Sequence, residues 1–201
     1  MNKLDSSLHR FPVKHFGTAS DFLLSAESEE RDTLMIACAD QGGAPDRVSF
    51  AKSGRFFVVQ HLASSIRPAG DRDENSEISD IEFAFSKYKI KHVIICGHTG
   101  CGVIRNWLLY PDAPDVSGIR ARFEQTTLEA VNQAYPEYSA EDRIEALICE
   151  HTLFQLEHLC SHAFIRNKLE AGTLQLHAWV VNDNTARVRS YDPARGCFAI
   201  I

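Results

Sequence analysis

Two short stretches of this chain hold residues that can bind a metal ion. One is Cys38-Ala-Asp40, and the other is Gly97-His-Thr-Gly-Cys-Gly102. Each stands at the end of an apolar run, TLMIACAD at 33–40 and KHVIICGH at 91–98, and such runs are typical of buried strands. Because ligand sites in open parallel sheets lie beyond the carboxyl ends of the strands, we expect the two stretches to meet at one point.

Zinc binding is the chemistry that these residues favour. Cys38, His98 and Cys101 offer two thiolates and an imidazole, and Asp40 offers an oxygen ligand that could close a tetrahedral set. The glycines of the second stretch allow a tight turn in which His98 and Cys101 face one ion, and a helix N-terminus near Cys101 would favour its thiolate. A single His-x-x-Cys pair is a weak signal, which the second stretch at another strand end strengthens.

The rest of the chain predicts the elements that would position these residues. Apolar runs at 55–62 and 174–181 predict two more buried strands, and ARVRSY at 186–191 predicts an antiparallel edge strand. Apolar residues have helical spacing over 76–88, which predicts a helix between the second and third strands. Strands that alternate with helices indicate an α/β fold with a mostly parallel central β-sheet, about four parallel strands plus an antiparallel edge strand, flanked by helices.

A second helical region is predicted near the end of the chain. Ser139-Ala-Glu-Asp142 resembles a capping box, and a periodic apolar stretch follows it as far as Gly172. With 201 residues and no linker, the sequence predicts one domain over 31–201 and an N-terminal arm over 1–30. The phenylalanines and leucines of the arm are too sparse for a core element, so we expect the arm to pack on something else, with a partner subunit as one candidate.

Composition excludes several classes of protein. The chain is 44% hydrophobic and 24% charged, which is ordinary for a globular protein and unlike a disordered one. Its net charge of −6 with scattered Lys and Arg argues against nucleic-acid binding. No apolar run reaches the roughly 18–20 residues of a membrane span, and the N-terminus lacks an apolar signal stretch. We therefore expect a soluble, cytoplasmic protein with no membrane or nucleic-acid partner.

Most of the remaining thiols and imidazoles have ordinary explanations. The four other cysteines, at 96, 149, 160 and 197, are expected to be small core residues. His158 and His162 are four apart on one predicted helix, where packing or surface roles outweigh metal binding, and His177 is expected in the core. His61, at the end of the second strand, is the histidine we expect to line the substrate pocket or to transfer protons.

The two metal-binding stretches also resemble a known family. Cys-x-Asp after the first strand and Gly-His-x-x-Cys-Gly after the third, in this order and separation, are similar to the motifs of β-class carbonic anhydrases, and the resemblance extends from about Thr33 to Tyr191. It implies a Zn²⁺ ion held by Cys38, His98 and Cys101 in a homodimer or homotetramer, with Gly102 beside the substrate.

The sequence departs from that family in the residues around the metal ligands. The family places an arginine two residues after the aspartate, where it holds the carboxylate off the metal, and here Gly42 stands at that position. Arg47 follows Asp40 by seven residues and is the candidate replacement, with a solvated surface arginine as the alternative. The family's bicarbonate-binding glutamine has no equivalent in Ser25–Thr33, and His151 and His158 replace two asparagines of a helical motif.

Three functions remain open at this point. The resemblance implies hydration of carbon dioxide to bicarbonate by a hydroxide formed when zinc lowers the pKa of water from about 16 towards 7, with Asp40 and Arg47 as catalytic residues. One alternative is hydrolysis of carbonyl sulfide or carbon disulfide on the same scaffold. The other is a non-catalytic zinc protein in which Asp40 is the fourth ligand. The small-molecule substrate and the fourth ligand are not fixed by the sequence.

Overall fold

The computed structural model describes residues 6–18, 22, 30–41, 54–71, 76–110, 112 and 118–201. Its strands are β1 (Thr33–Cys38), β2 (Phe56–His61), β3 (His92–His98), β4 (Gln175–Val181), β5 (Val188–Asp192) and β6 (Cys197–Ile200). Its helices are α3 (Ser76–Lys87), α4 (Gly102–Leu109), α5 (Ile119–Phe123), α6 (Glu129–Ala134), α7 (Ala140–Cys160) and α8 (Ala163–Glu170). Shorter helical turns are η1 (Val13–His15), η3 (Leu62–Ser64) and η4 (Glu124–Leu128), the last of these a π-helical turn between α5 and α6.

All six strands form one sheet in the order β2-β1-β3-β4-β5-β6. The first four are parallel to one another, and β5 and β6 are added antiparallel. The predicted α/β fold with four parallel strands is therefore confirmed. The antiparallel strand predicted at 186–191 is present as β5, but it is not the edge, because the four-residue β6 pairs with it and takes that position.

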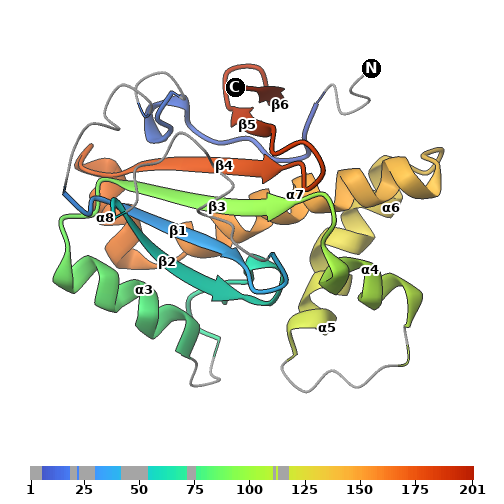
Figure 1. Ribbon diagram of the computed structural model, residues 1–201, viewed down its shortest axis with the longest axis horizontal. Coiled ribbons are helices and arrows are strands. Elements are labelled where there is room, and N and C mark those ends of the chain that lie inside the picture. Colours follow the sequence, from blue (N-terminus) through green and yellow to red (C-terminus); the bar gives the residue numbers. More distant parts are fainter. Residues whose placement is uncertain are drawn as a thin grey trace.

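The carboxyl ends of the parallel strands point towards α4, α5 and α6 (Figure 1). Residues alternate between the two faces of the sheet, so Leu34 and Ile36 belong to one buried cluster while Met35 and Ala37 belong to another. The long helix α7 packs against β3 and β4. It belongs to the first cluster through Leu147, Leu153 and other apolar residues.

Ser139 is confirmed as the N-cap of α7. Ser139 Oγ accepts a hydrogen bond from the Asp142 amide (3.2 Å) and donates one to Asp142 Oδ2 (2.7 Å). The helical region that was expected to run on to Gly172 is instead two helices, because α7 ends at Cys160 and α8 starts at Ala163. Ser161 Oγ donates to the His158 carbonyl (2.6 Å) and accepts from the Ala69 amide (2.7 Å), a long-range contact that stabilises the break.

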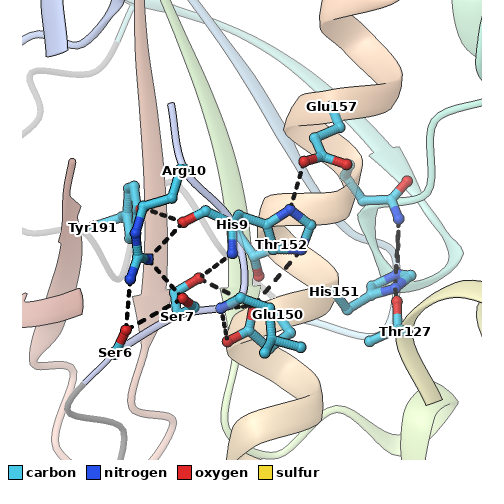
Figure 2. Close-up of polar contacts among 12 residues, drawn as sticks. Ser6, Ser7, His9, Arg10, Thr127, Glu150, His151, Thr152, Glu157 and Tyr191 are labelled. Atoms are coloured by element: carbon cyan, nitrogen blue, oxygen red, sulfur yellow. Dashed lines mark hydrogen bonds and ion pairs between the residues drawn. The ribbon is translucent and has the colours of Figure 1, made fainter. Parts of the chain in front are cut away.

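The described part of the N-terminal arm packs on its own chain. Phe16 pairs with Leu176 in an isolated parallel bridge, and Phe22, 1% exposed, contacts Trp179 at a ring distance of 5.2 Å. Phe16 belongs to the first buried cluster and Phe22 to the second, so this part of the arm packs on the domain of its own chain. Ser7 and His9 reach α7 at Glu150 and Glu157 (Figure 2).

Among the described residues, no helix has the length and apolar character that crossing a membrane requires.

Candidate metal centre

Neighbouring strand ends bring the three predicted zinc ligands together. Cys38 ends β1, His98 ends β3, and Cys101 lies in the turn that leads into α4. The two sulfurs are 3.8 Å apart, and these sulfurs and one ring nitrogen of His98 all lie within 4.8 Å of one another. All three residues are buried, with 1–3% of each side chain exposed. The convergence predicted from the strand ends is therefore present.

Without a metal, the two cysteines share one proton. A hydrogen bond from the Cys101 thiol is the main reason that the pKa of Cys38 is lowered from 9.0 to about 4; burial opposes this shift, whereas His98 and the backbone amides of Asp40 and Ala63 assist it. The pKa of Cys101 is raised because its thiol donates to Cys38 and is buried. The pair is therefore predisposed to hold one thiolate, and its remaining proton would be lost when a metal binds.

His98 is fixed on one side and open on the other. Its Nδ1 is hydrogen bonded to Asp183 Oδ2 at 2.8 Å, whereas its Nε2 is buried and makes no hydrogen bond. Burial lowers the pKa of His98, but the Cys38 and Asp183 side chains, which lie within hydrogen-bonding reach of the ring and carry negative charge, raise it by more. A buried imidazole nitrogen without a partner, next to two sulfurs, is an acceptor that fits a metal ion.

A small cavity of about 10 Å³ adjoins the three ligands. This volume holds about one water-sized sphere. Its lining includes the ligands and, from α7, Ile148, His151 and Thr152. Burial lowers the pKa of His151 to about 3, so this histidine is neutral near pH 7, and its Nδ1 is hydrogen bonded to Thr127 Oγ1 at 3.1 Å.

The wall of the cavity after β2 has an unusual backbone. Ala63 and Ser64 both have positive φ angles, 54° and 57°, which cost energy in residues other than glycine. Ser64 Oγ donates to the Cys96 carbonyl (2.9 Å) and ties this turn to β3. The Ala63 amide donates to the Cys38 sulfur, so the strained turn supplies a hydrogen bond to a candidate zinc ligand.

Asp40 lies beside the cluster and is held by a backbone amide. Its Oδ2 accepts a hydrogen bond from Gly102 N at 2.6 Å. A Cβ atom at position 102 would stand 2.9 Å from the same oxygen, so glycine permits this close approach. Gly42 and Arg47, which bear on the pairing of Asp40, lie outside the described residues.

The other predicted histidines are accounted for by contacts within the chain. His61 pairs with Cys38 in the register of β2 and β1, so it lies at the same carboxyl end of the sheet as the metal ligands. His177 is 1% exposed and its Nε2 lies 3.2 Å from His92 Nδ1, which confirms its core position. His158 and His162 hydrogen bond to the carbonyls of Ile66 and Arg67.

Asp183 and the cavity position of His151 were not predicted. Asp183 follows the end of β4, so the strand-end rule that located Cys38 and His98 could have pointed to it. Of the other cysteines, Cys96 and Cys149 are buried as expected, and Cys160 and Cys197 are partly exposed.

Zinc is the ion that this donor set fits. Two sulfurs and one imidazole nitrogen are soft ligands that select zinc over magnesium or calcium, and His98 Nε2 lacks any other partner. Three protein ligands and a neighbouring carboxylate leave a fourth position that either water or Asp40 could take.

Comparisons with known proteins agree with this geometry. The family model described as carbonic anhydrase matches residues 33–188. Two similar relatives are the carbonic anhydrases of Synechococcus elongatus, 29% identical over 94% of this chain and 70% of the relative, and of Pseudomonas aeruginosa, 28% identical over 80% and 73%.

Solved structures of β-carbonic anhydrases have the same fold. The β-carbonic anhydrase CcaA superimposes with a TM-score of 0.77 at 25% identity, covering 90% of this chain and 89% of that one. One of two tetrameric β-carbonic anhydrases from Sordaria macrospora gives a TM-score of 0.63 at 19% identity, covering 90% and 87%. The fold, the order of the cysteine and histidine motifs and the matched family model together show that this chain belongs to the β-class carbonic anhydrase family.

Proposed function

We propose that this protein is a zinc-dependent carbonic anhydrase that reversibly hydrates carbon dioxide to bicarbonate. The observation that carries the proposal is the convergence of the Cys38 and Cys101 sulfurs with a buried His98 whose Nε2 has no hydrogen-bond partner. Family membership supports the reaction, since the relatives with 28–29% identity are themselves carbonic anhydrases.

Each side chain has a definite part in this proposal. Cys38, His98 and Cys101 would hold the ion, and a bound Zn²⁺ makes water acidic enough to ionise near neutral pH. The substrate would bind beside the ion at the strand ends. Gly102 and His61 stay candidate substrate contacts, although neither lines the small cavity at the ligands.

Asp40 is the candidate catalytic carboxylate, and its hydrogen bond supports an open fourth position. The Gly102 amide binds Asp40 Oδ2 at 2.6 Å, which opposes coordination of this oxygen to the ion. Arg47 stays a candidate second partner for Asp40. If Asp40 nevertheless takes the fourth position, hydration will be weak near pH 7 and will rise at higher pH, where hydroxide competes better for the ion.

Metal analysis and activity of one matched pair of variants test the proposal. We expect about one zinc per chain in the parent, in keeping with a site of three protein ligands. Cys101→Ser should lose the zinc and the activity. Cys149→Ser is the control, because Cys149 is equally buried, on α7, but outside the cluster. A parent without zinc, or Cys101→Ser with full zinc and activity, would overturn the proposal.

A second variant tests the role of Arg47. Arg47→Ala should abolish carbon dioxide hydration if this arginine partners Asp40, and should change the rate little if the Gly102 amide is sufficient. Stopped-flow rates at pH 7 and pH 8.5 for the parent and for Arg47→Ala separate the two outcomes.

We also propose that the chain assembles as a homodimer or homotetramer. The two tetrameric β-carbonic anhydrases from Sordaria macrospora, which share this fold, support the assembly. Light scattering of the intact chain is the measurement, and a stable monomer at micromolar concentration would contradict it.

A further inference from the structure

Asp183 joins the turn after β3 to the end of β4. Its Oδ2 accepts two hydrogen bonds, from His98 Nδ1 (2.8 Å) and from the Gly100 amide (2.8 Å). The backbone supports the same link, since Asp183 N donates to Thr99 Oγ1 (3.2 Å) and Thr99 N donates to the Val181 carbonyl (3.0 Å). Four hydrogen bonds therefore connect two segments that are 85 residues apart in sequence.

The sheet register brings these segments together. β3 and β4 are parallel, and His98 pairs with Val181, so Asp183 lies two residues beyond the pairing partner of the candidate zinc ligand. Gly100 is adapted to this contact, because a Cβ atom at that position would clash with Asp183 Oδ2. Only a residue without a side chain at position 100 allows the carboxylate to approach the turn so closely.

The hydrogen bond decides which nitrogen of His98 is available. A carboxylate accepts and cannot donate when ionised, so the proton of the neutral imidazole must lie on Nδ1. Nε2 then keeps its lone pair, and it is this nitrogen that is buried without a hydrogen-bond partner. A carboxylate behind a ligating histidine also fixes the ring and increases the basicity of the ligand nitrogen.

We propose that Asp183 is a positioning residue of the metal centre, which holds the proton of His98 on Nδ1 and leaves Nε2 as the metal-binding nitrogen. The inference rests on the proposed zinc binding. Asp183 acts through His98 and through the turn at Gly100, so it is not itself a ligand or a catalytic residue. Loss of such a partner weakens metal binding about 10- to 100-fold.

Zinc release from the holoenzyme to an excess of chelator tests this role. We expect release from Asp183→Ala to be about 10- to 100-fold faster than from the parent, or the affinity to fall by the same factor. Asp183→Asn should have a smaller effect, because its neutral oxygen can still accept from His98. This variant keeps the size of the side chain and covers the case in which Asp183→Ala does not fold.

Asp192→Asn is the matched control. This substitution also removes one negative charge. Asp192 Oδ1 accepts from the amides of Ala194 and Arg195, in a turn that does not contact His98. We expect this variant to release zinc at the rate of the parent.

A spectroscopic readout separates positioning from a purely structural role. In the zinc-loaded parent, ¹⁵N NMR should show His98 with a proton on Nδ1 in a strong hydrogen bond, and this signal should shift or broaden in Asp183→Ala. The inference would be overturned, with the proposed function still standing, if both Asp183 variants release zinc at the rate of the parent and keep its Nδ1 signal. A parent that carries no zinc would instead overturn the proposed function together with this inference.

Discussion

Two buried polar clusters meet on α7, and they differ in whether groups of the chain itself fill their hydrogen-bonding positions. Glu150 faces the N-terminal arm, and the next residue, His151, lines the cavity beside the candidate metal ligands. Figure 2 shows both residues on the helix, with Glu150 among the arm residues and His151 turned towards Thr127. The same helix therefore supports one cluster that is closed by the chain itself and one that has room for a ligand.

In the arm cluster, the carboxylate of Glu150 is fully engaged by groups of its own chain, and His9 Nε2 is the buried atom that has no hydrogen bond. Glu150, with none of its side chain exposed, accepts from Ser7 Oγ (3.1 Å), the Leu8 amide (3.1 Å) and the Tyr135 hydroxyl (3.3 Å). His9 lies between two carboxylates, with Nδ1 2.7 Å from Glu157 and Nε2 3.6 Å from Glu150. Burial still raises the pKa of Glu150, which these hydrogen bonds oppose.

The metal cluster, by contrast, is incomplete. Cys38 and Cys101 share a single proton, and His98 Nε2 has no hydrogen bond. Buried polar groups are nearly always paired, so an unpaired one beside two thiols indicates where a ligand belongs. Neither burial nor an unpaired nitrogen marks a functional site by itself; an unpaired nitrogen beside two thiols does.

Of the changes to these two clusters, metal removal should have the largest effect on the free energy of unfolding. If zinc completes the Cys38, His98 and Cys101 cluster, chelation should lower the free energy of unfolding by about 4 kcal/mol relative to protein in free zinc at 1,000 times the dissociation constant. Urea unfolding with zinc and with chelator measures the difference. Identical curves would mean that the cluster is stable without an ion.

Replacement of Glu150 should disturb the other cluster only. Glu150→Ala leaves the donors of Ser7, Leu8 and Tyr135 without their acceptor, and we expect a loss of about 3 kcal/mol in the free energy of unfolding. The zinc content should stay at the parent level. Glu137→Ala, at an exposed position, is the control and should change stability little. Loss of zinc from Glu150→Ala would show that the two clusters are not independent.

The contrast also explains what the sequence could predict. Cys38, His98 and Cys101 could be located because each stands at a strand end, and the parallel sheet brings such ends together. The start of α7 could be located because Ser139 and Asp142 are close in sequence. These are rules that act within a few residues or along one sheet edge.

Long-range contacts account for what was not predicted. The partnership of Asp183 with His98 depends on the pairing of β3 with β4, the end of α7 depends on a contact between Ser161 and Ala69, and the burial of Phe22 depends on Trp179. β6 is too short, at four residues, for an alternating pattern to identify it. In each case the residue types are compatible with several environments, and tertiary packing selects one.

The smallest expected effect concerns a histidine that tests whether an unpaired nitrogen is sufficient for a metal site. His177 Nδ1 is buried and makes no hydrogen bond, as His98 Nε2 does not, yet no thiol or carboxylate of the described residues completes a metal cluster around His177. Burial, together with the neighbouring His92 and Arg55, lowers the pKa of His177 to about 3. We therefore expect His177→Gln to keep the full zinc content of the parent.

The lowered pKa of His177 also predicts how the free energy of unfolding depends on pH. Above about pH 6.5, His177 is neutral in both the folded and the unfolded chain and contributes no pH dependence. As the pH falls from 6.5 towards 3, the unfolded chain takes up a proton that the folded chain does not, so stability is lost, by about 2 kcal/mol between pH 7 and pH 5. Urea unfolding at both pH values should show that His177→Gln lacks this part of the loss. An equal loss in parent and variant would mean that His177 takes up a proton in the folded protein as readily as in the unfolded one, against the lowered pKa.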